Sequence, residues 1–553
     1  MVEGQNLESH AAQCIVYSKR TAKLMNSVEL TSDGKTAGLP EYTNLKRAGD
    51  VESGMVNRMK TGRQRFRWNL IFNVLLWILL PLPLWLPYLT QHFGVNVISY
   101  WVLPIIQGCF MFFWIVVGIL AIRTTWIMFR NRKEDFRSKL TTAQKNQIHH
   151  LAVISCYKEP VELIASTIDT LAQQTVASDT TMVVSFEEKT PDLRNKQGQL
   201  CDLFGQRFQE IIFTIHPFGQ EGEIPGKCSN ANCGIRTALA HVKRRDQNAF
   251  NPANILITTC DADSKFHPRY LEALTYKYFN TKDAITGCIF QAPLLYNWKL
   301  DELSVVTRVT GLVRAFLMMG AMIPFNINTM SIFSFSASLC IAGDFIHPGY
   351  QMDDIIALIR WMGVCKKRIR IVMIPLPILS GPTTGRVLEE EIEEWARQAR
   401  RWTIGAAEVF HYFMVKSRNI PFFSALSWGI TFFLYYVVIL CCASLYGIVL
   451  GVSIGFIMPT MDGFPTILTY FNYVSLGFNY VVFALIFVID VFTVKLTQPR
   501  IYERISLVRN IFQWILSPFV LIGYSLVELF ALHEVMIRGK KVCKHGASKK
   551  DNL

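Results

Sequence analysis

The sequence predicts an α/β domain with a mixed sheet, inserted between two groups of membrane-spanning helices. Long apolar stretches without charge lie on both sides of the middle of the chain, and the middle itself alternates short apolar strands with helical stretches. The composition agrees with this organisation. Only 18% of the residues are charged, whereas an average soluble protein has about 25%, so we expect part of the chain to lie in lipid.

The apolar stretches are long enough to cross a bilayer, since a spanning helix needs about 20 mostly apolar residues. They cover residues 68–90, 95–122, 419–461, 463–489 and 510–527. We expect four spans, two within 66–129 and the others within 419–537. The shortest stretch, 510–527, allows two interpretations: it is re-entrant or interfacial, or it crosses the membrane and 419–461 contains two short spans.

Lys and Arg indicate the orientation, because they accumulate on the cytoplasmic side of membrane proteins. Basic residues crowd just before the first apolar stretch and just after the second, whereas the connection 91–95 has none, and the later stretches show the same asymmetry. We therefore expect a multi-pass protein whose middle domain, 140–400, faces the cytosol. Residues 1–60 are expected to form a disordered cytosolic tail and 538–553 a basic cytosolic tail.

The middle domain is expected to be a parallel or mixed sheet covered by helices. Ligands in such folds bind at the carboxyl ends of the strands, so the informative residues directly follow a strand. The chain has neither a G-x-x-x-x-G-K-[ST] phosphate loop nor a G-x-G-x-x-G turn after a strand, which argues against a nucleotide-driven pump and a dinucleotide enzyme. The predicted strands are 151–156, 181–185, 211–215 and 255–259, and the predicted helices are 160–174, 229–243 and 268–279.

Asp261 and Asp263 follow the predicted strand 255–259. Residues two apart on an extended chain point to the same side, so both carboxylates can face one site. A magnesium or manganese ion takes one or two carboxylates plus substrate phosphates, and such an ion would neutralise a departing diphosphate. The alternative is a turn rich in Asp, but the position at the end of a strand favours a metal site.

Gln398, Arg401 and Trp402 share one face of a predicted helix, because positions i, i+3 and i+4 are neighbours. An arginine can fork onto diphosphate oxygens, and an indole can pack on a sugar ring. Alternatively, the acidic start of this segment, 389–394, and its basic end, 397–401, simply suit the helix dipole.

Asp354 and Lys227 are further candidates, each with a simpler alternative. A sugar transfer that inverts configuration needs a base for the proton of the acceptor hydroxyl, and Asp354 suits this role at the start of a predicted helix near 355–362. Its neighbour Asp353 is expected to cap that helix. Lys227, which follows Gly226, would contact a phosphate as a point charge, or else it is a solvated surface lysine.

In this order, with membrane helices on both sides, the motifs resemble those of the processive family-2 glycosyltransferases, which include cellulose, chitin and hyaluronan synthases. The resemblance covers roughly residues 60–500. Besides the motifs above, it includes Tyr157 and Glu159 just after the first strand. It implies a GT-A-type glycosyltransferase domain in a multi-pass membrane protein, at the plasma membrane rather than the Golgi, with an interfacial helix over 395–418.

The resemblance also implies a role for each motif, and it includes one departure. The family has an aspartate after its second strand that binds the uridine base, but here that stretch ends in Glu187 and Glu188. Either of these replaces the aspartate, or the base is held differently. The other implied roles are binding of Mg²⁺ or Mn²⁺ by Asp263 with Asp261, nucleotide-sugar binding by Tyr157, Glu159 and Lys227, proton abstraction by Asp354, and diphosphate and acceptor binding by Gln398, Arg401 and Trp402.

Two further segments resemble parts of these enzymes. Residues 334–338 are similar to a stretch of small residues beside the acceptor, and residues 301–321 are similar to an interfacial helix. Arg308 and Arg314 interrupt 301–321 with charge, as in an amphipathic segment.

The function implied first is a UDP-sugar-dependent hexosyltransferase that extends a β-linked polysaccharide, such as a cell-wall polymer, and passes it through its own helices. The alternative is transfer of a single sugar to a membrane lipid, which resembles the ceramide glucosyltransferases. A scaffold or transporter without chemistry is a third hypothesis. The net charge of +14 also fits nucleic acid, but the basic residues lie beside the apolar stretches, where a membrane surface would be, so we expect no nucleic-acid partner.

Overall fold

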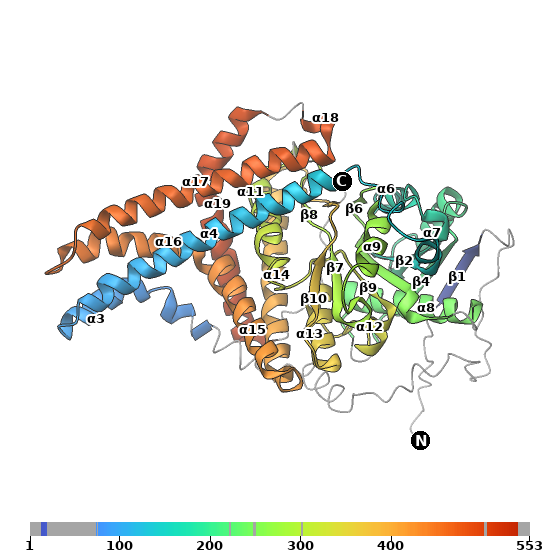
Figure 1. Ribbon diagram of the computed structural model, residues 1–553, viewed down its shortest axis with the longest axis horizontal. Helices are drawn as coiled ribbons and strands as arrows, with labels where there is room; N and C mark the ends of the chain where they lie inside the picture. Colours follow the sequence, from blue (N-terminus) through green and yellow to red (C-terminus); the bar gives the residue numbers. More distant parts are fainter. Residues whose placement is uncertain are drawn as a thin grey trace, which may run out of the picture.

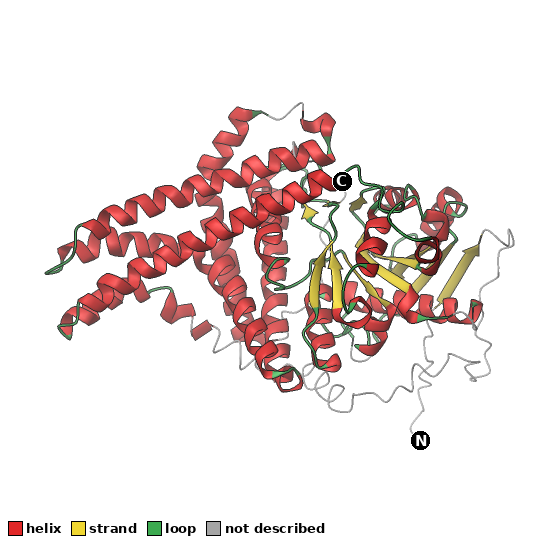
Figure 2. Ribbon diagram, in the orientation of Figure 1, coloured by secondary structure: helices red, strands yellow, loops and turns green. Residues whose placement is uncertain are grey.

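The computed structural model describes residues 13–18, 73–74, 76–220, 223–246, 250–299, 302–502 and 506–539. It consists of an α/β domain and a set of long helices that extends away from one side of it (Figures 1 and 2). The predicted α/β class with a mixed sheet is confirmed. Most of the tail expected over 1–60, and all but the start of the tail expected over 538–553, lies outside the described residues.

The main sheet has eight strands in the order β1-β4-β3-β2-β5-β9-β7-β10. Its centre is parallel, and the order reverses between β2 and β5, the kind of position where α/β sheets bind ligands. The four predicted strands are confirmed as the parallel centre: β2 (His149–Cys156), β3 (Thr180–Glu187), β4 (Glu210–His216) and β5 (Ile255–Asp261). The sequence predicts these strands because buried parallel strands are nearly continuous apolar runs.

Antiparallel strands extend both edges of this centre. On one side β9 (Phe333–Ser336) runs antiparallel to β5 and to β7 (Cys288–Gln291), and β10 (Arg370–Met373) runs parallel to β7. On the other side β1 (Gln13–Ser18) runs antiparallel to β4. A second, small sheet contains β6 (Ser264–Phe266), β11 (Ile378–Ser380) and β8 (Leu294–Leu295).

The predicted helices of this domain are confirmed. They are α6 (Val161–Ala172), α8 (Lys227–Arg245), α9 (Tyr270–Phe279) and α13 (Asp353–Cys365), the last of which covers the helix predicted near 355–362. The structure adds α7 (Leu193–Phe204) and α12 (Ala337–Ala342). Helix α8 packs on β2, β3 and β4. Its Gly234 permits this close approach, because a Cβ there would lie 3.1 Å from the Ser185 side chain and 3.2 Å from Val153.

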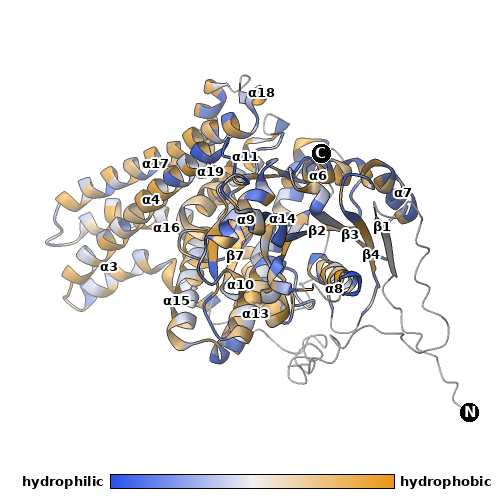
Figure 3. Ribbon diagram, turned by 45° about the vertical axis from the view of Figure 1, so that its right-hand side comes forward, coloured by the Kyte–Doolittle hydropathy of each residue, from blue (hydrophilic) through white to orange (hydrophobic). Residues whose placement is uncertain are grey.

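Six helical segments are long and apolar enough to cross a membrane, counted over the described part of the chain. They are α4 (Val97–Asn131), Val305–Met322, Phe422–Leu440, Ala443–Thr460, α17 (Ile467–Thr497) and α19 (Leu507–Arg538). Figure 3 shows hydrophobic residues along α4, α16 (Ala443–Val452) and α17. The structure therefore supports long apolar helices on both sides of the α/β domain, most of them after it.

These helices differ from the expected four spans both after and before the α/β domain. After it, the stretch 419–461 contains two candidate spans and α19 is a further one, which agrees with the second of the two interpretations of 510–527, and α19 has 32 residues, far longer than that apolar run. At the first predicted stretch, the described residues form a short helical piece up to Leu79 and then α3 (Leu82–His92), and neither is a candidate span. Pro81 and Pro83 account for this break, because proline disrupts a helix beyond its first turn.

The segment expected to be an interfacial helix over 301–321 is instead packed inside the chain. It forms α11 (Val305–Leu317) and a π-helical extension to Met322, and 78% of this 18-residue segment is buried. The Arg308 side chain is buried too. It pairs with Asp490 of α17 at 3.1 Å and donates to Asn510 of α19 at 2.9 Å, so its charge is neutralised by other helices and not by a membrane surface.

Candidate active site

A cavity of about 580 Å³ lies at the carboxyl ends of the central strands. Residues from β2, β3 and β5 line it, together with the start of α8, the start of α13, and faces of α11 and α14 (Leu388–Lys416). Of the predicted site residues, all but Glu188 belong to its lining: Tyr157, Glu159, Glu187, Lys227, Asp261, Asp263, Asp354, Gln398, Arg401 and Trp402. Segments distant in sequence therefore meet in one place.

Lys227 is the electrostatic centre of this cavity. Its ammonium lies 2.9 Å from Asp261 and 3.1 Å from Asp353, and it donates to the Ser331 carbonyl at 2.6 Å. Gly226 precedes it with a φ of 152°, a backbone conformation that residues with a side chain rarely adopt. The chain turns at this glycine, and Lys227 is the first residue of α8. The lysine is therefore no solvated surface residue.

Asp353 and Asp354 open α13, but the expected cap is wrong. The N-cap residue is Met352, so Asp353 is already helical, and its carboxylate pairs with Lys227. Asp354 is 5% exposed and accepts a hydrogen bond from the Ile355 amide at 2.8 Å. Burial and the neighbouring charge of Asp353 raise the pKa of Asp354 to about 7, against the smaller opposing effect of Lys227. A carboxylate with this pKa suits a base that works near neutral pH.

Asp261 and Asp263 present a donor set that fits Mg²⁺ or Mn²⁺. Asp261 ends β5, and Asp263 lies in the turn between β5 and β6. The set consists of carboxylate oxygens, which these hard ions prefer, and the Lys227 ammonium already occupies a cation position beside Asp261. No group of three or more His, Cys, Asp or Glu side chains among the described residues could hold a metal alone. An ion here would therefore depend on further ligands such as phosphate oxygens or water.

The predicted common face of Gln398, Arg401 and Trp402 does point into the cavity from α14. The Thr383 hydroxyl donates to the side-chain oxygen of Gln398. The guanidinium of Arg314, from α11, lies 3.2 Å from the centroid of the Trp402 ring, an arrangement typical of a cation–π contact. These contacts hold the amide and the indole in fixed orientations.

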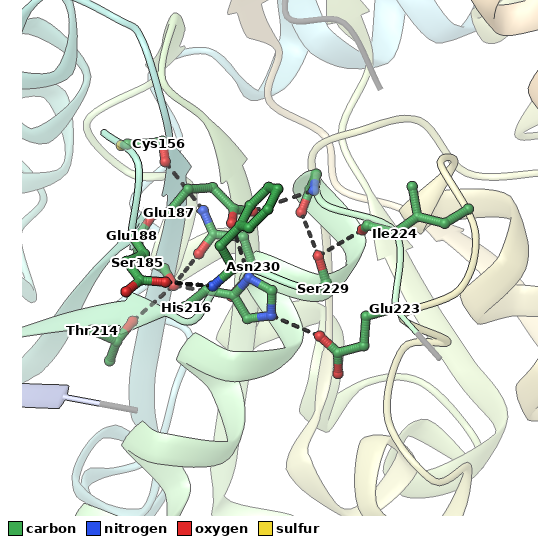
Figure 4. Close-up of polar contacts among 12 residues, drawn as sticks. Cys156, Ser185, Glu187, Glu188, Thr214, His216, Glu223, Ile224, Ser229 and Asn230 are labelled. Atoms are coloured by element: carbon green, nitrogen blue, oxygen red, sulfur yellow. Dashed lines mark hydrogen bonds and ion pairs between the residues drawn. The ribbon is translucent and has the colours of Figure 1, made fainter. Parts of the chain in front are cut away.

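Figure 4 shows polar contacts among side chains near the ends of β3 and β4. Glu187 lines the cavity, and its carboxylate contacts the ring of His216 at 2.9 Å and accepts from the Gly226 amide at 3.3 Å. Glu188 instead accepts from the Phe218 amide at 2.7 Å. β3 ends at Glu187, and Glu188 lies in the turn that follows, so of the two glutamates only the first faces the cavity.

Asn230 of α8 connects the strands at this end (Figure 4). Its amide donates to the carbonyls of Cys156 at 3.2 Å and Ser185 at 2.9 Å, and it accepts from the Ser185 hydroxyl at 2.6 Å. Nearby, the Lys189 ammonium lies 3.2 Å from the centroid of the Phe218 ring, and both side chains line the cavity. This end of the cavity therefore presents the Glu187 carboxylate, the ends of β2 and β3 held together by the Asn230 amide, and the exposed ring of Phe218.

A second cavity, of about 490 Å³, lies among α4, α11, α16, α17 and α19. Thr310 and Arg314 of α11 line both cavities. Most of the side chains around the second cavity are apolar or aromatic, with a few amides such as Gln107, which donates to Asn472 at 2.7 Å. The two cavities therefore have a common wall.

Sequence reasoning missed several residues of the site and misplaced one segment. His216 directly follows the predicted strand 211–215, so the rule that selected Asp261 could have selected it. Tyr296 lines the cavity from a loop that carries no motif. Conversely, residues 334–338 do not appear among the described lining residues: Ser334 is buried in β9, within hydrogen-bond distance of Thr258 and Tyr270.

Comparison with known proteins gives the following. The chain matches no family model, and it matches no curated protein. Among solved structures, a mannosyltransferase from Pyrobaculum calidifontis in complex with GDP-Man and Mn²⁺ is similar with a TM-score of 0.36 and 11% identity, over 77% of this chain and 98% of that one. S. aureus TarS 1–349 is similar with a TM-score of 0.28 and 9% identity, over 61% of this chain and 90% of that one. The third structure is glucosyl-3-phosphoglycerate synthase from Mycobacterium tuberculosis in complex with Mn²⁺, UDP and phosphoglyceric acid. Its TM-score is 0.28 and its identity 14%, over 50% of this chain and 81% of that one. Values this low assign neither a family nor an activity to this chain.

Proposed function

We propose that this protein is a membrane-embedded, inverting glycosyltransferase of the GT-A type that transfers a hexose from a UDP-sugar to the growing end of a β-linked polysaccharide. One observation carries the proposal. Candidate groups for the nucleotide, the diphosphate, the proton and the acceptor line a single cavity, and that cavity shares Thr310 and Arg314 with a second cavity among apolar helices. A product made in the first cavity would have its exit path in the second.

The donor would lie with its base near Glu187 and its diphosphate near Lys227. Mg²⁺ or Mn²⁺, held by Asp261 and Asp263, would supply positive charge for the leaving diphosphate. Lys227 would exchange its carboxylate partners for phosphate oxygens. Arg401 would add a guanidinium to the same diphosphate.

Asp354 would act on the acceptor. It would take the proton from the acceptor hydroxyl while the hydroxyl oxygen forms a bond to the anomeric carbon, on the face opposite the departing UDP. The bond between that carbon and the diphosphate oxygen breaks with its electron pair leaving on UDP, so the configuration inverts. Trp402, braced by Arg314, would stack on the sugar ring at the acceptor end, beside Gln398.

The proposed setting is a bilayer in which the α/β domain faces the cytosol, in the plasma membrane. The partners are then a cytosolic UDP-sugar, a growing glycan and lipid. The support is the asymmetric distribution of Lys and Arg around the apolar stretches together with six candidate spans.

A second candidate function is transfer of a single sugar to a membrane lipid. The observation that favours it is the mainly apolar and aromatic wall of the second cavity, because such a wall also suits an acyl chain. In that case the chain would lie in the second cavity and the hydroxyl to be glycosylated would reach past Arg314.

The test uses the full chain reconstituted in lipid with Mn²⁺ or Mg²⁺ and a panel of radiolabelled UDP-sugars. Product size is measured by gel and by digestion with specific glycanases. We expect a polymer that Asp354→Asn abolishes and that Asp202→Asn, an exposed carboxylate on α7, leaves unchanged. A product of one sugar on lipid would instead select the second candidate. Binding of UDP without transfer from any UDP-sugar would overturn both.

A further inference from the structure

His216 ends β4 with its ring buried between two carboxylates (Figure 4). Its Nδ1 lies 2.9 Å from Glu187 Oε2, and its Nε2 lies 2.7 Å from Glu223 Oε2. Only the imidazolium form can donate from both nitrogens, so this geometry calls for a charged ring. The arrangement is a histidine cation shared by a glutamate of a strand end and a glutamate of a loop.

The charge of this ring is consistent with its surroundings. Burial opposes it, but the hydrogen bonds and charges of Glu187 and Glu223 outweigh burial and raise the pKa of His216 to about 9. Glu187 approaches from β3 and Glu223 from the segment before α8, and among the described residues these two carboxylates form ion pairs with the ring. The cluster therefore places a histidine cation between the carboxyl groups of Glu187 and Glu223.

Both partners of His216 connect to the cavity. Glu187 lines it directly, and its second oxygen accepts from the Gly226 amide, next to Lys227. Glu223 begins the segment 223–226, in which Ile224 and Gly226 also line the cavity. His216 itself is not among the described lining residues. From outside the lining, His216 therefore connects the Glu187 carboxylate, which faces the cavity, with the segment 223–226, which precedes Lys227.

We infer that His216 is a positioning residue for the nucleotide: it orients the Glu187 carboxylate toward the base and holds segment 223–226 against β4. This inference rests on the proposed function, since it assigns the β3–β4 end of the cavity to the base. Without the ring, Glu187 and Glu223 would repel each other, and the carboxylate that accepts an N–H from the base would lose its fixed direction.

The chain contains a matched control for this inference. His241 of α8 contacts Glu210, at the start of β4, at 2.8 Å. It is again a histidine paired with a glutamate on the same sheet, but neither residue is among the described lining of the cavity. If losing any histidine–glutamate pair on this sheet weakened nucleotide binding, substitutions at His216 and His241 would have equal effects.

The experiment compares wild type, His216→Gln, Glu223→Gln and His241→Gln as full chains in lipid. Binding of UDP is measured by calorimetry, and KM for the donor and kcat are measured for transfer. Loss of charge-assisted hydrogen bonds costs roughly tenfold or more in affinity, so we expect His216→Gln to weaken UDP binding and raise donor KM about tenfold, with kcat within about twofold. Glu223→Gln should have a smaller effect in the same direction, and His241→Gln none.

A pH series separates positioning from a merely structural role. The ratio of UDP dissociation constants, variant over wild type, removes the titration of uracil itself. With His216→Gln as the variant, this ratio should fall toward one as the pH rises through about 9, because wild type then loses the same charge. With His241→Gln it should stay flat.

Unchanged UDP binding in folded His216→Gln would overturn the inference. If that variant does not fold, Glu223→Gln decides: its side chain is 25% exposed, and unchanged binding there has the same meaning. Failure of the wild type to bind UDP would instead overturn the proposed function.

Discussion

Lys227 occupies a position where one cation serves two acidic segments of the site. It lies between Asp261 at the end of β5 and Asp353 at the start of α13. Of the three side chains only that of Asp353 is fully buried, so removing Lys227 costs less than the roughly 3–5 kcal/mol of a fully buried pair. The lysine therefore contributes to the stability of the empty site as well as to binding.

We predict that Lys227→Met lowers Tm and that Mn²⁺ restores part of the loss, because a divalent ion can replace the missing ammonium beside Asp261. The measurement is Tm with and without Mn²⁺, and the increment should be larger in the variant than in wild type. Lys367→Met, which breaks the exposed pair with Asp283, is the control and should show no such difference. An equal increment in all three proteins would contradict the prediction.

The proton-accepting role of Asp354 predicts a particular pH dependence. A base must be ionised to act, and the pKa of Asp354 is raised to about 7 by burial and by Asp353. The kcat/KM value for transfer should therefore rise as the pH increases through about 7 and then level off. A pH–rate profile at saturating Mn²⁺ measures this. A rate that is flat between pH 5 and 8 would argue against Asp354 as the base.

At the scale of elements, α8 positions Lys227 through its contact with the sheet. Gly234 lets the helix approach Ser185 and Val153, and a methyl group there would lie 3.1 Å from the first side chain and 3.2 Å from the second, so the neighbours would have to shift by a few tenths of an ångström. Overpacking of this kind costs about 1–3 kcal/mol. We predict that Gly234→Ala lowers Tm and weakens UDP binding, because the start of α8 shifts.

Gly198→Ala on α7 is the matched control for that prediction. Nothing lies within 4 Å of a Cβ at Gly198, and alanine in a helix is favoured over glycine by about 0.5–1 kcal/mol. Tm should therefore rise slightly and UDP binding should stay constant. Destabilisation by both variants would contradict the prediction, because no close contact opposes a methyl group at Gly198.

The sequence was most informative for single strands and helices and least informative about what covers them. The parallel centre of the sheet and α8 followed from apolar runs and periodicity. The segment 334–338 did not, because small residues suit both a ligand site and a tight antiparallel strand. Likewise Arg308 and Arg314 suggested an amphipathic surface helix, but their partners come from α17, α19 and α14, which no local pattern reveals.

In the site, too, the positions of individual residues were predictable from the sequence, whereas their contacts with one another were not. Strand-end placement located Asp261, and helical spacing located Gln398, Arg401 and Trp402. Neither rule states which side chains pair when the cavity is empty, so the contacts of Lys227 with two aspartates were not predictable. The choice between Glu187 and Glu188 as the cavity-facing residue depended on where β3 ends, because Glu187 is its last residue and Glu188 lies in the following turn.

At the scale of the whole molecule, a buried ion pair joins α11, which borders both cavities, to the longer helices. We predict that Arg308→Leu alone lowers Tm strongly, because Asp490 is left unpaired, and that adding Asp490→Leu recovers most of the loss. Thermal unfolding in lipid measures both. The exposed pair of Lys139 and Glu134 is the control, and Lys139→Met should change Tm little. A double variant less stable than either single variant would contradict the prediction.

Helix α14 carries Gln398, Arg401 and Trp402 on one face and is fastened to α19 along another. Trp395 packs near Tyr524, and Arg400 donates to Glu534 at 2.6 Å. In the proposed setting, α19 adjusts its tilt when its apolar length and the thickness of the hydrocarbon layer differ. Because α14 moves with it, acyl-chain length would set the distance between the indole of Trp402 and the carboxylate of Asp354. The lipid would then act on the rate of transfer as an effector, without entering either cavity.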